Sequence, residues 1–187
     1  WNVDFAAWCT YQYMNSSPGG VSGIFVHEKH GNNPETPRLA GWWGHKESER
    51  FQMKKGFIPE PGAAGWQLSN APVLAMAAHK ASLDMFDEVG MDALVAKGKQ
   101  LNTFLEQVVM DAQGANDKLE FEIITPEERG CQLSMLTNEN GKALFDYLTE
   151  RDVIADWREP NVIRLAPVPM YNSFMDVWEF GELLKEF

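Results

Sequence analysis

The alternation of apolar and polar positions divides the chain into two parts. Residues 1–68 carry short β-like apolar runs separated by Gly, Pro and Trp, whereas apolar positions recur at helical spacing from residue 69 onward. Residues 21–26 predict a buried strand that is entered through a turn at 16–20. Residues 31–65 predict a long loop, and its aromatic side chains argue against disorder.

The second part predicts a mixed helical and strand domain. Two helices are expected, the first with Ser69 or Asn70 as its cap and Pro72 in its first turn, and the second after Gly90. The further elements expected are strands at 121–124, 132–136, 153–155 and 162–165, a helix at 141–150, and a last helix with a capping box at Ser173 and Asp176. This order indicates an α+β layer domain.

Composition and charge narrow the classes of partner. The 187 residues are 44% hydrophobic, which is enough for one core or two small ones, and the net charge is −11. That charge argues against nucleic acid and anionic membranes, and no apolar run reaches the length of a bilayer span. Without a basic leader, and with Cys9 and Cys131 far apart, we expect a cytoplasmic protein with reduced cysteines. The start at Trp1, inside apparent structure, suggests a fragment or one subunit of a split protein.

The common motifs for chemistry are weak in this chain. His27 and His30 are three residues apart, and a helix could direct both at one metal ion. They follow a predicted strand without an evident third ligand, so a solvated loop is the favoured interpretation and no metal is expected. Neither a P-loop nor a G-x-S-x-G nucleophile motif is present.

Two features are more informative. Arg164 interrupts the apolar run at 162–166, and a guanidinium near a core needs a carboxylate or phosphate partner. Residue type alone leaves an internal salt bridge and a site for a substrate carboxylate equally open. Residues 41–45, Gly-Trp-Trp-Gly-His, place two indoles in the long loop, where their N–H groups suit either a ligand site or an interface.

Taken together, several unusual segments resemble the kynureninase family. The segments that carry the resemblance, in the same order as in that family, are 1–15 followed by Gly19-Gly20, then 25–30, 41–45, 65–70, 128–132 and 164–174. Kynureninases are pyridoxal 5'-phosphate (PLP) enzymes of tryptophan catabolism that hydrolyse L-kynurenine, or its 3-hydroxy form, to an anthranilate and L-alanine. The resemblance implies an α/β PLP-dependent transferase fold, like that of aspartate aminotransferase. Residues 1–68 would end the large PLP-binding domain, and 69–187 would form the small C-terminal α+β domain.

The resemblance also implies roles for individual residues. The side chains expected to contact the PLP phosphate are Tyr11, Trp42 and Asn70, the last two reaching across to the neighbouring subunit of a homodimer. His45 and Trp43 would lie near the aromatic ring of the substrate. Arg164 would hold the substrate α-carboxylate through a two-pronged contact, which shifts its interpretation toward the substrate site.

Position 12 departs from the family. Gln12 stands where kynureninases have the lysine that forms the Schiff base with PLP. An amide is neither a nucleophilic amine nor a base, so the chain as written is expected to be impaired. An engineered trap, a degenerate paralogue and an error at a modified lysine all fit this change.

Two further functions stay open beside a kynureninase. One is another PLP enzyme of this fold, such as a relative of the cysteine desulfurases, against which residues 41–45 and 164–174 weigh. The other is a catalytically dead homologue that acts as a binding or scaffolding subunit, and Gln12 is its support.

Overall fold

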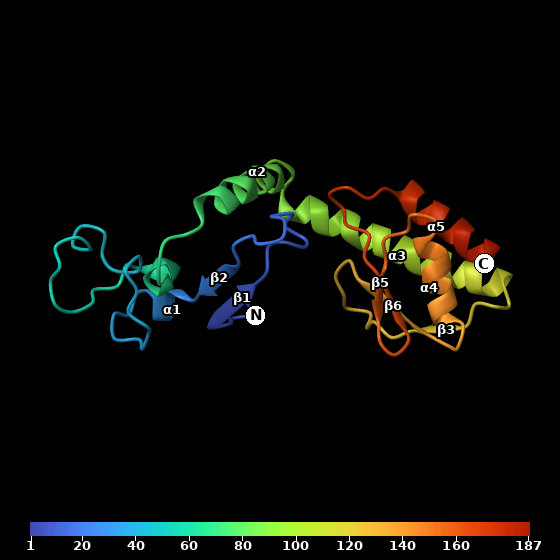
Figure 1. The fold of residues 1–187 in the computed structure, drawn as a ribbon, viewed down its shortest axis with the longest axis horizontal. Helices are drawn as coiled ribbons and strands as arrows, with labels where there is room; N and C mark the ends of the chain where they lie inside the picture. Colours follow the sequence, from blue (N-terminus) through green and yellow to red (C-terminus); the bar gives the residue numbers. More distant parts are fainter. The chain divides into compact units, whose positions relative to one another are not determined.

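The computed structural model describes all residues from 1 to 187, which form two compact units, Trp1–Glu88 and Val89–Phe187 (Figure 1). The elements of the first unit are β1 (Phe5–Trp8), β2 (Gly23–Val26), the one-turn α1 (Glu28–Gly31), the 3-10 helix η1 (Gly62–Trp66) and α2 (Val73–Val89), which reaches the boundary. The strand predicted at 21–26 and the first predicted helix are confirmed, but the strand is not buried as expected, because Ile24 and Phe25 are 47% and 43% exposed. Periodicity did not predict β1 or α1, because four residues are too few to display a period.

The start of α2 differs from the prediction. The backbone carbonyl of Pro72 accepts a hydrogen bond from the N–H of Met76 at 3.0 Å, so Pro72 directly precedes the helix. Ser69 and Asn70 lie further upstream in irregular chain. Because proline lacks a backbone N–H, it suits this position without a side-chain cap.

The first unit has no apolar core of its own. Strands β1 and β2 form a two-stranded antiparallel sheet, with Phe5 opposite Val26, and every residue of β1 is exposed. The buried hydrophobic side chains of the chain all lie between Leu94 and Leu184, in the second unit. The side chains fully buried in the first unit are instead polar, namely those of Thr10, Ser16 and Ser82.

The second unit is built around a four-stranded antiparallel sheet. Its elements are α3 (Met91–Ala115), β3 (Phe121–Ile123), β4 (Leu133–Thr137), α4 (Gly141–Thr149), β5 (Asp156–Arg158), β6 (Val162–Leu165) and α5 (Phe174–Glu186). The strand order is β3-β4-β6-β5. Buried side chains of the three helices pack with those of β4 and β6, such as Met135 and Ile163, and so cover one face of the sheet. Each fully buried Leu or Ile contributes about 1.5–3 kcal/mol.

Most elements predicted for this unit are confirmed, and one is wrong. Strand β5 starts at Asp156, and residues 153–155 are not a strand. The N–H of Val153 donates to the carbonyl of Leu148 at 3.0 Å, which closes the end of α4. Val153 and Ala155 pack against the core, so their apolar character reflects burial in a helix-terminal turn.

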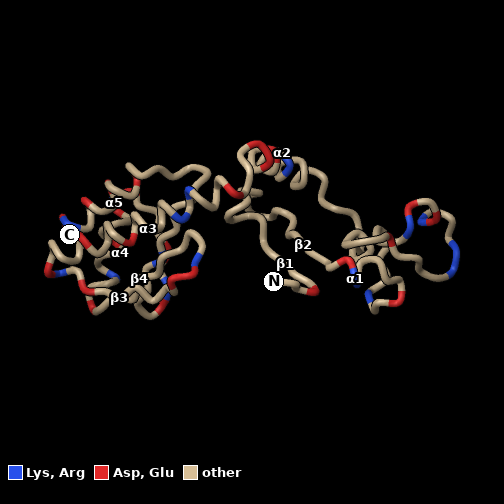
Figure 2. The backbone as a smooth tube through the Cα atoms, turned by 180° about the vertical axis from the view of Figure 1, so that it is seen from behind, with Lys and Arg blue, Asp and Glu red and all other residues tan.

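The capping box of α5 is confirmed. The hydroxyl of Ser173 accepts from the N–H of Asp176 at 3.2 Å, and the Asp176 carboxylate accepts from the N–H of Ser173 at 3.0 Å. Hydrogen bonding from Ser173 lowers the pKa of Asp176. In Figure 2, Lys and Arg are dispersed along the chain among Asp and Glu.

Candidate functional site

Gln12 lies in an exposed loop that follows β1 and is held by polar contacts. The hydroxyl of Thr10 lies 2.7 Å from that of Ser16 and donates to the carbonyl of Val21 at 2.5 Å. The thiol of Cys9 donates to the side-chain oxygen of Gln12 at 3.4 Å. Gln12 and its neighbour Tyr11 are both exposed, so the loop presents these two side chains outward.

The backbones of residues 41–44 and 65–68 run against each other. A Cβ atom on Gly41 would lie 2.4 Å from the Cα of Leu68, and one on Gly44 would lie 2.8 Å from the carbonyl oxygen of Gln67. Only glycine allows this approach, which explains why glycines flank the tryptophan pair. The contact brings the predicted residues Trp42 and His45 close in the fold to the segment that leads to Asn70.

Arg50 organises the tryptophan turn and was not singled out from the sequence. Its Nη2 donates to the backbone carbonyls of Trp43 at 2.9 Å and His45 at 3.0 Å. Its guanidinium also lies 4.4 Å from the ring centroid of Trp43, a cation–π contact. Nothing in the polar run around Arg50 distinguishes it by residue type, because its role depends on which carbonyls the fold brings to it.

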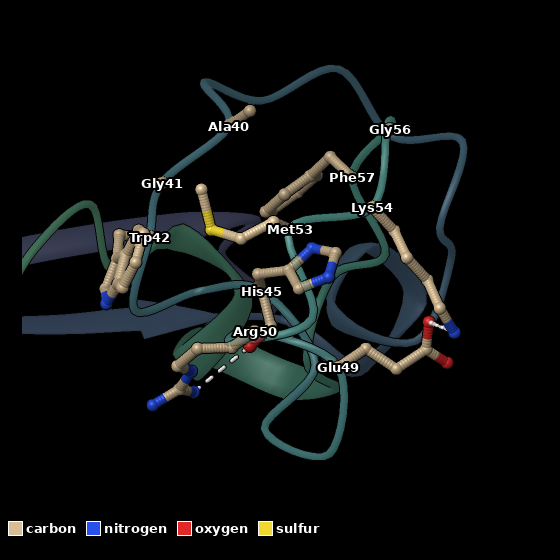
Figure 3. Close-up of a pocket in the computed structure, with 10 residues that line it drawn as sticks. All are labelled: Ala40, Gly41, Trp42, His45, Glu49, Arg50, Met53, Lys54, Gly56 and Phe57. Atoms are coloured by element: carbon tan, nitrogen blue, oxygen red, sulfur yellow. Dashed lines mark hydrogen bonds and ion pairs between the residues drawn. The ribbon is translucent and has the colours of Figure 1, made fainter.

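A pocket of about 300 Å³ lies beside this turn, and the residues lining it include Trp42, His45, Met53 and Phe57 (Figure 3). The N–H of Ile58 donates to Nδ1 of His45 at 3.1 Å. A backbone N–H can only donate, so Nε2 of this histidine carries the ring proton and remains available as a donor. The pocket therefore combines apolar side chains with the ring donor of His45 and with the charged side chains of Glu49, Arg50 and Lys54.

Trp43 lies differently from Trp42. Trp43 is half-buried beneath the Arg50 guanidinium and is not among the residues that line the pocket. Trp42 is 48% exposed and forms a T-shaped pair with Phe51, at 5.6 Å between ring centroids. The two tryptophans therefore have separate surroundings, and Trp42 is the one open to a ligand.

Arg164 belongs to the second unit, whereas the other six predicted site residues belong to the first. Its Nε donates to Oδ2 of Asp156 at 2.7 Å, and its Nη2 bonds the same oxygen. The internal salt bridge that the sequence left open is therefore present. The side chain of Arg164 nevertheless stays 31% exposed.

The histidine pair expected in a solvated loop lies at the one-turn helix α1. Nδ1 of His27 accepts from the N–H of Lys29 at 3.2 Å, and Nε2 of His30 lies 2.7 Å from Oδ1 of Asp4. Hydrogen bonds from Lys29 and then His30 lower the pKa of Asp4 to about 2. No three His, Cys, Asp or Glu side chains are grouped to hold a metal ion. No helix combines the length and apolar character needed to cross a membrane.

Comparison with solved structures defines the class of fold. The chain matches C-DES, solved with glycine covalently linked to its PLP cofactor, at a TM-score of 0.75 and 15% identity, covering 100% of this chain and 46% of that one. The fold is thus the α/β fold of the aspartate-aminotransferase class, represented here by a part of it.

Sequence comparison defines the family within that class. A family profile described as the kynureninase C-terminal domain matches residues 94–184. The kynureninases of Flavobacterium johnsoniae and Flavobacterium psychrophilum are 56% and 53% identical to the chain over 189 residues. The chain is therefore similar to kynureninases along its whole length, and residues 94–184 match the C-terminal domain of that family. These matches cover 100% of the chain but 44% of each relative, so it spans less than half of their length.

Proposed function

We propose that this chain is the C-terminal part of a PLP-dependent kynureninase. Within the whole enzyme it would serve the hydrolysis of L-kynurenine, or 3-hydroxykynurenine, to anthranilate or 3-hydroxyanthranilate and L-alanine, in tryptophan catabolism and NAD biosynthesis. The observation that carries this proposal is the 56% identity to a named kynureninase along the full chain. Residues 1–68 would complete the large domain, and residues 69–187 would form the small one.

The side chains proposed for the cofactor fit a phosphate group. Tyr11, Trp42 and Asn70 are exposed, and their hydroxyl, indole N–H and amide make no hydrogen bond within the chain. All three groups can donate hydrogen bonds, which the oxygen atoms of an anion accept. We propose that they hold the phosphate of PLP, with Trp42 and Asn70 serving the neighbouring subunit of a homodimer.

The proposal for substrate binding rests on the pocket and on Arg164. When bound, PLP supplies an electron sink for cleavage of the carbon–carbon bond. The apolar side chains in the pocket beside His45, among them Met53 and Phe57, suit an aromatic ring, and Nε2 of His45 can donate to a polar group on that ring. Trp43 would support this region through its contact with Arg50. Arg164 would bind the α-carboxylate of the substrate.

Charge and cysteine chemistry support the remaining proposals. The net charge of −11 opposes nucleic acid as a partner and opposes anionic membrane surfaces. Cys9 and Cys131 are both free thiols, which fits a cytoplasmic location. Burial raises the pKa of the Cys131 thiol, so it is not activated as a nucleophile.

The test concerns position 12 in the full-length protein that contains this chain. Gln12→Lys restores the amine that must attach the cofactor, so anthranilate release from L-kynurenine should rise by at least about 10³-fold, the order lost when an essential nucleophile is removed. Gln52→Lys places the same new charge on another exposed glutamine and should leave release at the level of the unchanged protein. Release is followed by anthranilate fluorescence.

The second candidate function is a binding subunit without catalysis, which Gln12 favours. It predicts that the unchanged protein and Gln12→Lys both bind PLP and L-kynurenine, and that neither releases anthranilate. That result would remove the proposed activity and retain the binding role.

A further inference from the structure

A polar row crosses the sheet of the second unit on the face away from the helices. Ile163 and Leu165 of β6 are buried in the core, so the alternation of side chains along the strand directs Arg164 to the opposite face. Arg164 lies opposite Ser134 of β4 and opposite Asp156 of β5. These three side chains therefore share one face.

Asp156 bonds only one side of the Arg164 guanidinium. Both Nε and Nη2 of Arg164 bond the single oxygen Oδ2 of Asp156. Nη1 of Arg164 makes no hydrogen bond within the chain, and the side chain is 31% exposed. The edge formed by Nη1 and Nη2 therefore remains open for a second carboxylate, because a guanidinium can bind carboxylates along two different edges.

The local charge still favours an anion after this pairing. Nε of Arg158 also lies 3.1 Å from Oδ2 of Asp156. One carboxylate thus faces two guanidinium groups, which leaves the trio of Asp156, Arg158 and Arg164 with a net positive charge. A carboxylate approaching Arg164 is attracted to the trio as a whole.

We infer that Asp156 is a positioning residue for substrate recognition: it holds Arg164 by the Nε side so that the Nη1 edge receives the α-carboxylate of the substrate. The inference rests on the proposed function. A free arginine side chain loses much rotamer freedom when it binds, and Asp156 imposes that order before the substrate arrives. The opposite role, competition between Asp156 and the substrate for Arg164, predicts the reverse effect on binding.

The experiment uses the full-length protein carrying Gln12→Lys as the parent, with PLP bound. Asp156→Asn keeps the side-chain shape but removes its charge, and Asp152→Asn makes the same change at an exposed residue of the same segment whose side chain makes no hydrogen bond. KM and kcat are measured for L-kynurenine, and the dissociation constant is measured for the decarboxylated amine analogue, which lacks the α-carboxylate.

Asp156→Asn should raise the KM for L-kynurenine about tenfold with kcat within about twofold, since ground-state binding is lost. Its affinity for the decarboxylated amine should equal that of the parent, and Asp152→Asn should match the parent in every measurement. Asp156→Glu returns the charge one methylene further out and should give an intermediate KM. This variant also keeps the test decisive if Asp156→Asn does not fold.

Three results would overturn the inference. An unchanged or lowered KM in Asp156→Asn would mean that the pair is purely structural or competes with substrate, while the proposed function stands. Equal weakening of L-kynurenine and the amine analogue would mean general disruption of the site. A parent that neither binds nor cleaves L-kynurenine would defeat the proposed function itself, and the inference with it.

Discussion

Single glycines decide how closely two loop segments of the candidate site approach. A Cβ atom added to Gly41 or Gly44 would lie too close to backbone atoms of residues 65–68. Backbone atoms cannot rotate away as a side chain can. The Gly-Trp-Trp-Gly pattern is therefore a packing requirement, and it supports the pocket that contains His45.

Gly44→Ala should destabilise the protein by about 1–3 kcal/mol, the usual cost of overpacking, and weaken PLP binding by displacing the tryptophan turn. Gly114→Ala is the matched control, because a Cβ there meets no atom within 4 Å and Gly114 lies inside α3. It should be neutral or stabilising by about 0.5–1 kcal/mol. Each variant is made in the full-length Gln12→Lys protein. Urea unfolding then measures its stability, and PLP titration measures its affinity for the cofactor. Equal behaviour of the two variants would contradict the packing argument.

Short elements of the first unit depend on side-chain contacts rather than on length. Helix α1 has four residues, far fewer than an isolated helix needs. Asp4, just before β1, accepts from His30, which also stacks on Phe5 at 4.9 Å between ring centroids. Helices α2 and α3, with 17 and 25 residues, carry enough periodic positions to be predicted from sequence, whereas α1 does not.

Asp4→Asn should lower the stability of the first unit in a way that depends on pH. Its pKa of about 2 lies below the ordinary value of 3.8, so the folded state favours the charged carboxylate. The stabilisation is therefore complete above pH 3.8 and disappears as the pH falls toward 2. The midpoints of urea unfolding of the unchanged protein and of Asp4→Asn should differ at pH 5 and converge toward pH 2. Asp87→Asn, at an exposed aspartate without a hydrogen bond, should show no such convergence.

Burial is divided unequally along the chain. The apolar core lies in the second unit, while the first exposes large side chains on its two-stranded sheet and the following loop, including Phe5, Trp8, Tyr11 and Phe25. Exposed apolar groups of this size ordinarily mark surfaces that another segment covers. The kynureninase relatives extend well beyond the matched region, and we propose that their additional length includes the covering part.

Residues 1–187 expressed alone should therefore associate and bind the dye ANS, whereas residues 89–187 should stay monomeric and bind little dye. The reason is that only the second unit buries its own apolar side chains. Light scattering after gel filtration gives the mass, and ANS fluorescence gives the exposed apolar surface. A monomeric 1–187 chain with no dye binding would show that the first unit needs no cover.

The amino-acid sequence by itself determined the long helices, the α5 capping box, strand β6 and the family resemblance, whereas the departure at Gln12 stays a prediction. These are local or linear features, because periodicity, caps and motif order are read along the chain. Tertiary structure alone decided the strand order β3-β4-β6-β5, the contact of residues 41–44 with 65–68, and the partners of Arg50 and Arg164. Such contacts depend on how the chain folds back on itself, so residue type could not choose between a salt bridge and a substrate for Arg164. Once β5 lies beside β6, Asp156 faces Arg164 across the sheet and leaves one edge of its guanidinium open.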